Sequence, residues 1–296
     1  MKIPFLKYKI VYFVFSGVLI LATIGCLVVF GLKPGIDFTG GSILEIEYIE
    51  ERPSNQEIKT AISDLDLGEI LVQPTEEKGV ILRMKNLSED THQEVIEKLK
   101  EDHQVEERRF ESIGPVIGQE LKEKTKIVII LALLTIVLYI AWAFRKVSKP
   151  VASWQYGIAA LLALFHDVLI PIGILSVLGK LYGVQVTIPV VTALLTVLGY
   201  SINNTVVVFD RIRENLLRHT GTYEEVVDNS LNQTLTRSIN TSLTTLFVLI
   251  AIFFFGGETL KYFALVLILG IIVGTYSSIF LASPILVAWL RRKKKI

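Results

Sequence analysis

The chain has 296 residues, of which 51% are hydrophobic, and its mean hydropathy is +0.54. This composition excludes an ordinary soluble protein and favours one that uses the lipid bilayer as its solvent. The formal net charge is only +1, but residues 33–118 carry 20 acidic and 10 basic residues, a net charge of −10. Because phosphate would be repelled by this acidic segment, the sequence also excludes a nucleic-acid-binding protein.

Six apolar stretches are long enough to cross about 30 Å of hydrocarbon as helices. The first, at 10–32, makes residues 1–32 the first transmembrane helix. A cleavable signal peptide is the alternative, but no Ala-x-Ala cleavage site follows the apolar run. The other five stretches form a predicted five-helix bundle at 119–296. They lie at about 119–144, 152–178, 187–209, 235–255 and 260–290, with a cytoplasmic loop at 210–234.

The placement of lysine and arginine predicts the orientation of these helices. Basic clusters lie at residues 2–9, 145–149, 211–218 and 291–295, all at ends that fall on one side of the membrane. The sequence therefore predicts that both termini are cytoplasmic and that residues 33–118 face the other side.

The segment 33–118 has the pattern of a globular domain. Alternating apolar residues at 43–48 predict a half-buried strand, and Ser54 followed by Glu57 predicts the capped start of a helix. Ser88 marks the start of a second helix. Further strands are expected at 69–73, 79–84 and 105–113. The predicted fold class is thus a membrane all-α six-helix bundle with an extracytoplasmic α+β ferredoxin-like domain of order β-α-β-β-α-β.

Polar side chains interrupt three of the apolar stretches. They are His166 and Asp167 in the third stretch, Tyr200, Ser201, Asn203 and Asn204 in the fourth, and Arg237 and Thr241 in the fifth. Unpaired charges are costly in hydrocarbon, so such residues normally face the interior of a bundle. We therefore expect a shared polar seam between these three helices. Two alternatives are that the small polar residues only hold helices together, and that Arg237 extends to the cytoplasmic boundary.

Other motifs indicate packing rather than chemistry. The spacing of Gly270 and Gly274 is typical of closely packed helices. The sequence from Gly199 to Asn203 approaches the Gly-x-Ser-x-Gly motif of hydrolases but lacks its last glycine. The four histidines do not have the spacing of metal ligands. We therefore expect no enzyme activity, no metal and no cofactor.

Four motifs in chain order carry a resemblance to a known family. They are Gly35 to Gly41 with Asp37, Gly40 and Gly41; Gly114 and Pro115 followed by Gly118; Gly199 to Glu214 with Asp210; and Arg237 to Ser242. Together they resemble the SecF family of the resistance-nodulation-division superfamily, the smaller half of the SecDF protein-export complex.

The resemblance implies a multi-pass protein of the bacterial cytoplasmic (inner) membrane that pairs with SecD and associates with the SecYEG channel, with YajC as a further candidate partner. It would use the proton motive force to assist preprotein translocation, and the polar seam would carry the protons. A rival hypothesis is a proton-coupled exporter of small molecules or lipids from the same superfamily. Such exporters usually hold both halves in one longer chain. A passive scaffold is a third possibility.

One residue departs from the family pattern. The family's fourth-span motif reads Gly-Tyr-Ser-x-Asn-Asp-Thr, and this chain has Asn204 in place of the aspartate. Asparagine has nearly the shape of aspartic acid but does not titrate near neutrality. Either Asn204 is an engineered substitution, or Asp167 and a carboxylate of SecD carry the proton. The family's fifth-span arginine corresponds to Arg237, which would tune the carboxylate.

Overall fold

The computed structural model describes residues 3–75, 77–145, 151–218 and 221–293. The chain forms two compact units. The helical unit comprises Met1–Leu32, Ile129–Val184 and Ile188–Ile296, and the sheet unit comprises Lys33–Val128 and Gln185–Thr187. Parts of three predicted basic clusters, at 2, 146–149 and 294–295, lie outside the described residues.

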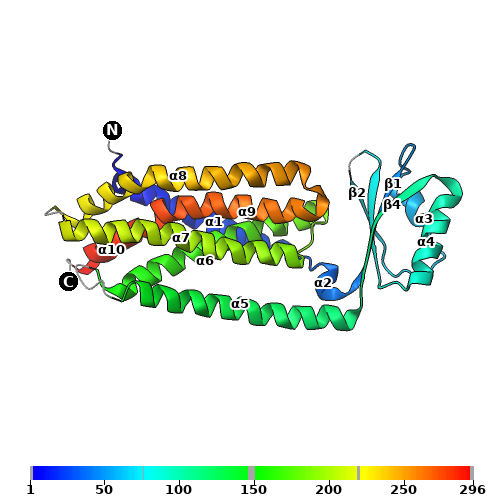
Figure 1. Cartoon of the computed structure of the whole chain (residues 1–296), viewed down its shortest axis with the longest axis horizontal. Helices are drawn as coiled ribbons and strands as arrows, with labels where there is room; N and C mark the ends of the chain where they lie inside the picture. The colour runs from blue at the N-terminus through cyan, green and yellow to red at the C-terminus, as the bar shows by residue number, and fades with distance from the viewer. Residues whose placement is uncertain (1–2, 76, 146–150, 219–220, 294–296) are drawn as a thin grey trace. The chain divides into compact units, whose positions relative to one another are not determined.

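Six helical segments of the described chain are long and apolar enough to cross a membrane, which makes this a multi-pass membrane protein (Figure 1). The elements are η1 (Phe5–Tyr8), α1 (Lys9–Phe30), α5 (Pro115–Ala143), α6 (Ser153–Tyr182), α7 (Ile188–Arg218), α8 (Tyr223–Phe255), α9 (Gly257–Ser277), the π-helical turn η2 (Ser278–Ala282) and α10 (Ser283–Lys293). The last span, Leu260–Leu290, runs through α9, η2 and most of α10.

The segment 210–234 was expected to be a loop, but most of it is helical, and only this part of the expectation was wrong. Helix α7 continues to Arg218, and α8 begins after Thr222, whose hydroxyl accepts a hydrogen bond from the amide of Glu225. The apolar residues of this segment are spaced for helices and bury themselves: Ile212 and Leu231 are fully buried. Its many charged residues hid that pattern.

Buried residues are concentrated on α6, α7 and the last span, whereas α1, α5 and α8 expose most of their length. Glycines allow the close approach of α9 to α7. A Cβ added to Gly270 would lie 2.1 Å from Cγ2 of Val197, and one added to Gly274 would lie 3.3 Å from Cβ of Ser201. The predicted packing role of these glycines is confirmed. It brings the backbone of α9 against the polar part of α7.

The sheet unit is built from four antiparallel strands in the order β2-β3-β1-β4. The strands are β1 (Gly41–Tyr48), β2 (Leu71–Thr75), β3 (Gly79–Met84) and β4 (Val105–Ile113), and the helices are α2 (Ile36–Thr39), α3 (Asn55–Ala61) and α4 (Glu89–Asp102). Helices α3 and α4 lie on the same face of the sheet (Figure 1). Strand β1 alternates as expected: Leu44, Ile46 and Tyr48 are buried beneath the helices, and the residues between them are only partly covered.

Candidate functional site

Asp167 is a fully buried carboxylate in the middle of α6. Its Oδ2 accepts hydrogen bonds from the hydroxyls of Ser201 on α7 at 2.5 Å and Ser277 on α9 at 2.6 Å. Its Oδ1 lies 2.9 Å from Nδ1 of His166. Three potential donors from three helices thus converge on one carboxylate, which is the arrangement that makes a buried charge tolerable.

A second chain of polar contacts begins at Asn204, which is 4% exposed. Its Nδ2 donates a long hydrogen bond of 3.5 Å to the hydroxyl of Thr275. Thr275 lies 2.6 Å from the hydroxyl of Ser242 on α8, which in turn accepts from the hydroxyl of Tyr200 at 3.0 Å. Among the described residues, the side-chain hydrogen bond of Asn204 therefore goes to α9 rather than to Arg237.

The last span contributes more to the seam than its sequence indicated. Thr275 and Ser277 belong to α9, and Ser278 begins η2 and lies 3.0 Å from the hydroxyl of Thr205 on α7. Single π-helical turns often occur at functional sites. Pro284 follows here and cannot supply the backbone N–H of a regular α-helix, which explains the local change in winding. We define the polar seam by the residues that make these contacts: His166, Asp167, Tyr200, Ser201, Asn204, Thr205, Ser242, Thr275, Ser277 and Ser278.

Three residues expected in the seam lie elsewhere. Arg237 and Thr241 are exposed on α8, and Asn203 is exposed on α7. In this part of α8, the buried polar residues are Ser238 and Ser242. Each lies one position after an expected seam residue, Arg237 or Thr241. One residue corresponds to about 100° around a helix, so the expected residues have helical spacing but face outward. The hydroxyl of Thr241 donates to the backbone carbonyl of Arg237.

The family-motif residues of the sheet unit form a close backbone contact. Gly40, with φ +73°, ends α2, and a Cβ there would lie 2.7 Å from Cα of Pro115. A Cβ on Gly118 would lie 2.7 Å from the amide nitrogen of Gly40. Only glycines allow the start of α5 to lie this close to the chain that enters β1. Gly41 also has a positive φ, 135°, and Asp37 lies in α2. Asp210 is exposed on α7, 3.6 Å from the guanidinium of Arg213.

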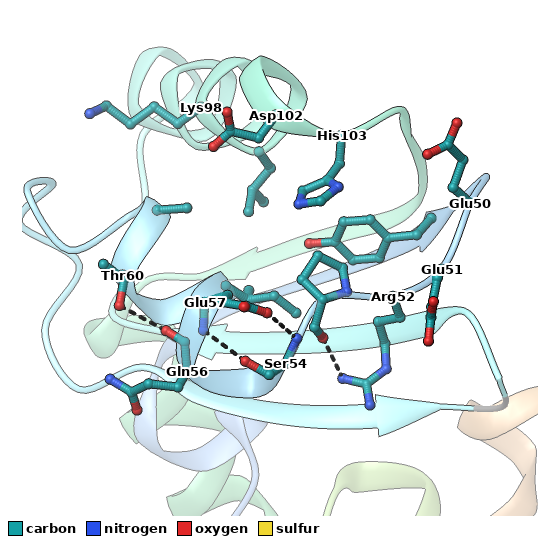
Figure 2. Close-up of a pocket in the computed structure, with 15 residues that line it drawn as sticks. Glu50, Glu51, Arg52, Ser54, Gln56, Glu57, Thr60, Lys98, Asp102 and His103 are labelled. Carbon is teal, nitrogen blue, oxygen red and sulfur yellow. Dashed lines mark hydrogen bonds between the residues drawn. The ribbon is translucent and has the colours of Figure 1, made fainter.

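The sheet unit has a hollow of about 900 Å³ lined by charged side chains (Figure 2). Among the groups that line it, the guanidinium of Arg52 donates to the carbonyl of Pro53 and to the side chain of Asn55. The amide and hydroxyl of Ser54 bond to Glu57 and hold the pKa of that carboxyl below its usual range. Burial raises the pKa of Tyr48, whose ring lies edge-on to His103, to about 12. No group of three or more His, Cys, Asp or Glu within the described ranges is arranged to hold a metal ion.

Comparisons with known proteins match this chain over nearly its whole length. The family model described as the C-terminal part of the protein export membrane protein SecD/SecF matches residues 92–292, and the SecD/SecF GG motif matches residues 27–48. The chain belongs to the SecD/SecF family. Its GG motif region includes Gly40 and Gly41, and the close contact of Gly40 with Pro115 is described above.

Relatives within the SecD/SecF family include the protein translocase subunit SecF of Thermobaculum terrenum, which is 42% identical over 97% of this chain and 94% of its own length. The SecF subunit of Anaerolinea thermophila is 38% identical over 95% of this chain and 92% of its own length. The crystal structure of SecDF from Thermus thermophilus, a translocon-associated membrane protein, matches with a TM-score of 0.86 and 32% identity. It covers 99% of this chain and 39% of the longer SecDF chain. This chain therefore has an accessory role in Sec-dependent export.

Proposed function

We propose that this chain is the SecF subunit that pairs with SecD in the bacterial inner membrane and uses the proton motive force to assist preprotein translocation through SecYEG. The observation that carries this proposal is the buried Asp167, held by Ser201 and Ser277 between three helices. An ionisable group at such a position in a membrane span is costly and is typical of proton pathways. The polar seam is then the route on which protons bind and leave.

The sheet order β2-β3-β1-β4 and the two helices on one face support the assignment of the sheet unit as a ferredoxin-like domain. The basic clusters support placing both termini in the cytoplasm and the sheet unit on the outer side. Protonation can drive a motion of this domain only if the two protonation states favour different helix packings. The tight glycine contact between α5 and the chain entering β1 would transmit such a change.

The outward face of α8 supports a docking site for SecD. Its exposed polar residues, which we name the α8 polar face, are Thr236, Arg237, Asn240, Thr241 and Thr244. By contrast, the exposed residues in the middle of α5, such as Leu131, Leu134 and Leu138, are aliphatic and suit lipid. A guanidinium on a membrane span needs a counter-charge, so SecD would place a carboxylate against Arg237.

Arg237→Gln should weaken the complex with SecD, raising its dissociation constant about tenfold or more, because the partner's carboxylate would be left buried without its counter-charge. The measurement is binding of purified SecD in detergent or nanodiscs. Arg213→Gln removes a cation from the cytoplasmic end of α7 and serves as the control. An unchanged affinity for the Arg237 variant would place the SecD contact elsewhere.

Reconstitution with SecD and SecYEG tests the function itself. An imposed proton gradient should stimulate preprotein translocation in these vesicles, and collapsing the gradient should remove the stimulation. A complex that works equally well without a gradient would be a passive scaffold. A gradient that drives the efflux of small molecules or lipids instead would support the exporter hypothesis.

Asn204→Asp should raise the proton-dependent part of translocation several-fold in the same vesicles. It places a second titratable carboxyl in the seam, next to Thr275. Asn203→Asp is the matched control, because it makes the same chemical change at the exposed neighbouring position. Equal activity of the Asn204→Asp variant and the parent chain would show that position 204 does not carry protons.

A further inference from the structure

His166 is fully buried, and only one of its two ring nitrogens has a hydrogen-bond partner among the described residues. Its Nδ1 lies 2.9 Å from Oδ1 of Asp167, whereas its buried Nε2 has no partner in the described part of the chain. Most buried polar atoms in native proteins are paired, because leaving one unpaired costs free energy. An imidazole with one engaged and one unengaged nitrogen is suited to receive a proton at the free nitrogen.

The two oxygens of Asp167 have different partners: His166 lies beside Oδ1, and two serines lie beside Oδ2. The titratable groups facing His166 are Asp167 on its own helix and Tyr276 of α9, whose ring lies 6.2 Å away, centroid to centroid. The hydroxyl of Tyr276 bonds to Ser16 and to the carbonyl of Tyr12 on α1. On the other side of Asp167, Oδ2 is occupied by the serines of α7 and α9. The ring of His166 is therefore the partner of Oδ1, on the side of the carboxylate that the serines leave free.

We propose that His166 relays protons into Asp167 through its ring, with Nε2 as the receiving atom. The starting state has Asp167 ionised and His166 neutral, with its proton on Nδ1. A proton from a hydronium ion in water bonds to the Nε2 lone pair, and the Nδ1–H bond then breaks as that proton passes to Oδ1. The products are a neutral carboxylic acid and a neutral imidazole with its proton on Nε2, so one proton enters and the charges balance.

The geometry accommodates both end states without moving a side chain. Before the transfer, the Asp167 carboxylate accepts from the imidazole Nδ1–H and from two hydroxyls. Afterwards the new O–H on Oδ1 donates to Nδ1, and Oδ2 keeps its bonds to Ser201 and Ser277. The relay rests on the proposed function, because it requires Asp167 to be the proton carrier.

The first test compares substitutions that separate relaying from hydrogen bonding. In His166→Asn the side-chain amide still donates to Oδ1 of Asp167, but it cannot pass a proton through. In vesicles containing the complex with SecD, we expect proton uptake to fall about tenfold or more. In His166→Ala we expect millimolar imidazole to restore part of the rate. His103→Asn, in the sheet unit, is the matched control and should leave uptake unchanged.

A His166→Asn variant with the parent's rate would overturn the relay, as would a lack of imidazole rescue in a stably folded His166→Ala protein. The Asp167→Asn variant, measured in the same vesicles, separates the carrier role of Asp167 from the relay through His166. If both Asp167→Asn and His166→Asn retain proton uptake, the carrier role of Asp167 is contradicted. If Asp167→Asn loses uptake and His166→Asn retains it, only the relay through His166 is contradicted.

Nitrogen-15 NMR of the histidine-labelled parent complex gives a second measurement that requires no substitution. We expect the proton of His166 to be on Nδ1 at high pH and on Nε2 after proton uptake. A ring that carries its proton on Nε2 while Asp167 is ionised would overturn the relay, because the receiving lone pair would then be occupied.

Discussion

We expect Asp167→Asn to abolish the response of translocation to a proton gradient, lowering the gradient-dependent rate on the order of 100-fold. Asparagine keeps the size of the side chain and an oxygen that can accept from Ser201 and Ser277. It removes the ability to bind and release a proton near neutral pH, and its amide places a donor instead of Oδ1 against Nδ1 of His166. The variant therefore separates titration from packing at the best-connected point of the seam.

The measurement uses the complex with SecD and SecYEG in vesicles, with and without an imposed gradient. Asp66→Asn is the matched control: its carboxylate is 92% exposed and pairs with Lys85 in the sheet unit. It should leave the response unchanged. Thermal unfolding of both variants in detergent shows whether the fold is kept. A folded Asp167→Asn protein that responds like the parent would remove Asp167 from the proton path.

The sheet unit followed from its sequence because alternation and capping are local signals. The pattern at 43–48 depends only on which face of one strand is buried, and the capping box of Ser54 and Glu57 is present as expected. Strand β2 begins two residues later than expected, at Leu71. Its sequence mixes exposed and buried residues without a regular period, so its ends carried little information.

The seam was only partly predictable because the direction in which a helix face points is not a local property. The polar spacing of α8 was correctly recognised, but its polar face containing Arg237 and Thr241 points away from the bundle. In the last span, Thr275, Ser277 and Ser278 form a short polar stretch within an apolar run and were not expected in the seam. Their role depends on the approach of α9 to α7, which requires the packed structure.

The α8 polar face also supports the proposal that SecD completes the site. A polar stripe on a membrane span is unfavourable against lipid, and the seam ends in an amide, Asn204, where the family pattern has a carboxylate. Both features are consistent with a second subunit that supplies acidic groups. In the proposed complex, the intramembrane chemistry would be divided between Asp167 within this chain and carboxylates that SecD would bring to Arg237.

Gly40→Ala should be the most damaging single-methyl change in the sheet unit. A backbone with positive φ and extended ψ costs about 1–3 kcal/mol in a residue with a Cβ, and overpacking typically adds about 1–3 kcal/mol. Both penalties apply here, because φ is +73° and the new Cβ would lie 2.7 Å from Cα of Pro115. Pro115 is a backbone obstacle at the start of α5, so it cannot rotate away as a side chain could. We expect lower thermal stability and greater protease sensitivity of the sheet unit.

Gly114→Ala provides the matched control, because a Cβ at that glycine meets no atom within 4 Å. It should change the stability by no more than about 0.5 kcal/mol. Gly118→Ala disturbs the same contact, because its Cβ would lie 2.7 Å from the amide nitrogen of Gly40. The losses of stability from Gly40→Ala and Gly118→Ala should therefore be non-additive. If this contact transmits motion from the seam, Gly40→Ala should also reduce gradient-driven translocation, and Gly114→Ala should not. Equal damage from both alanines would show that flexibility of the connection from β4 to α5, rather than the tight glycine contact, is what export requires.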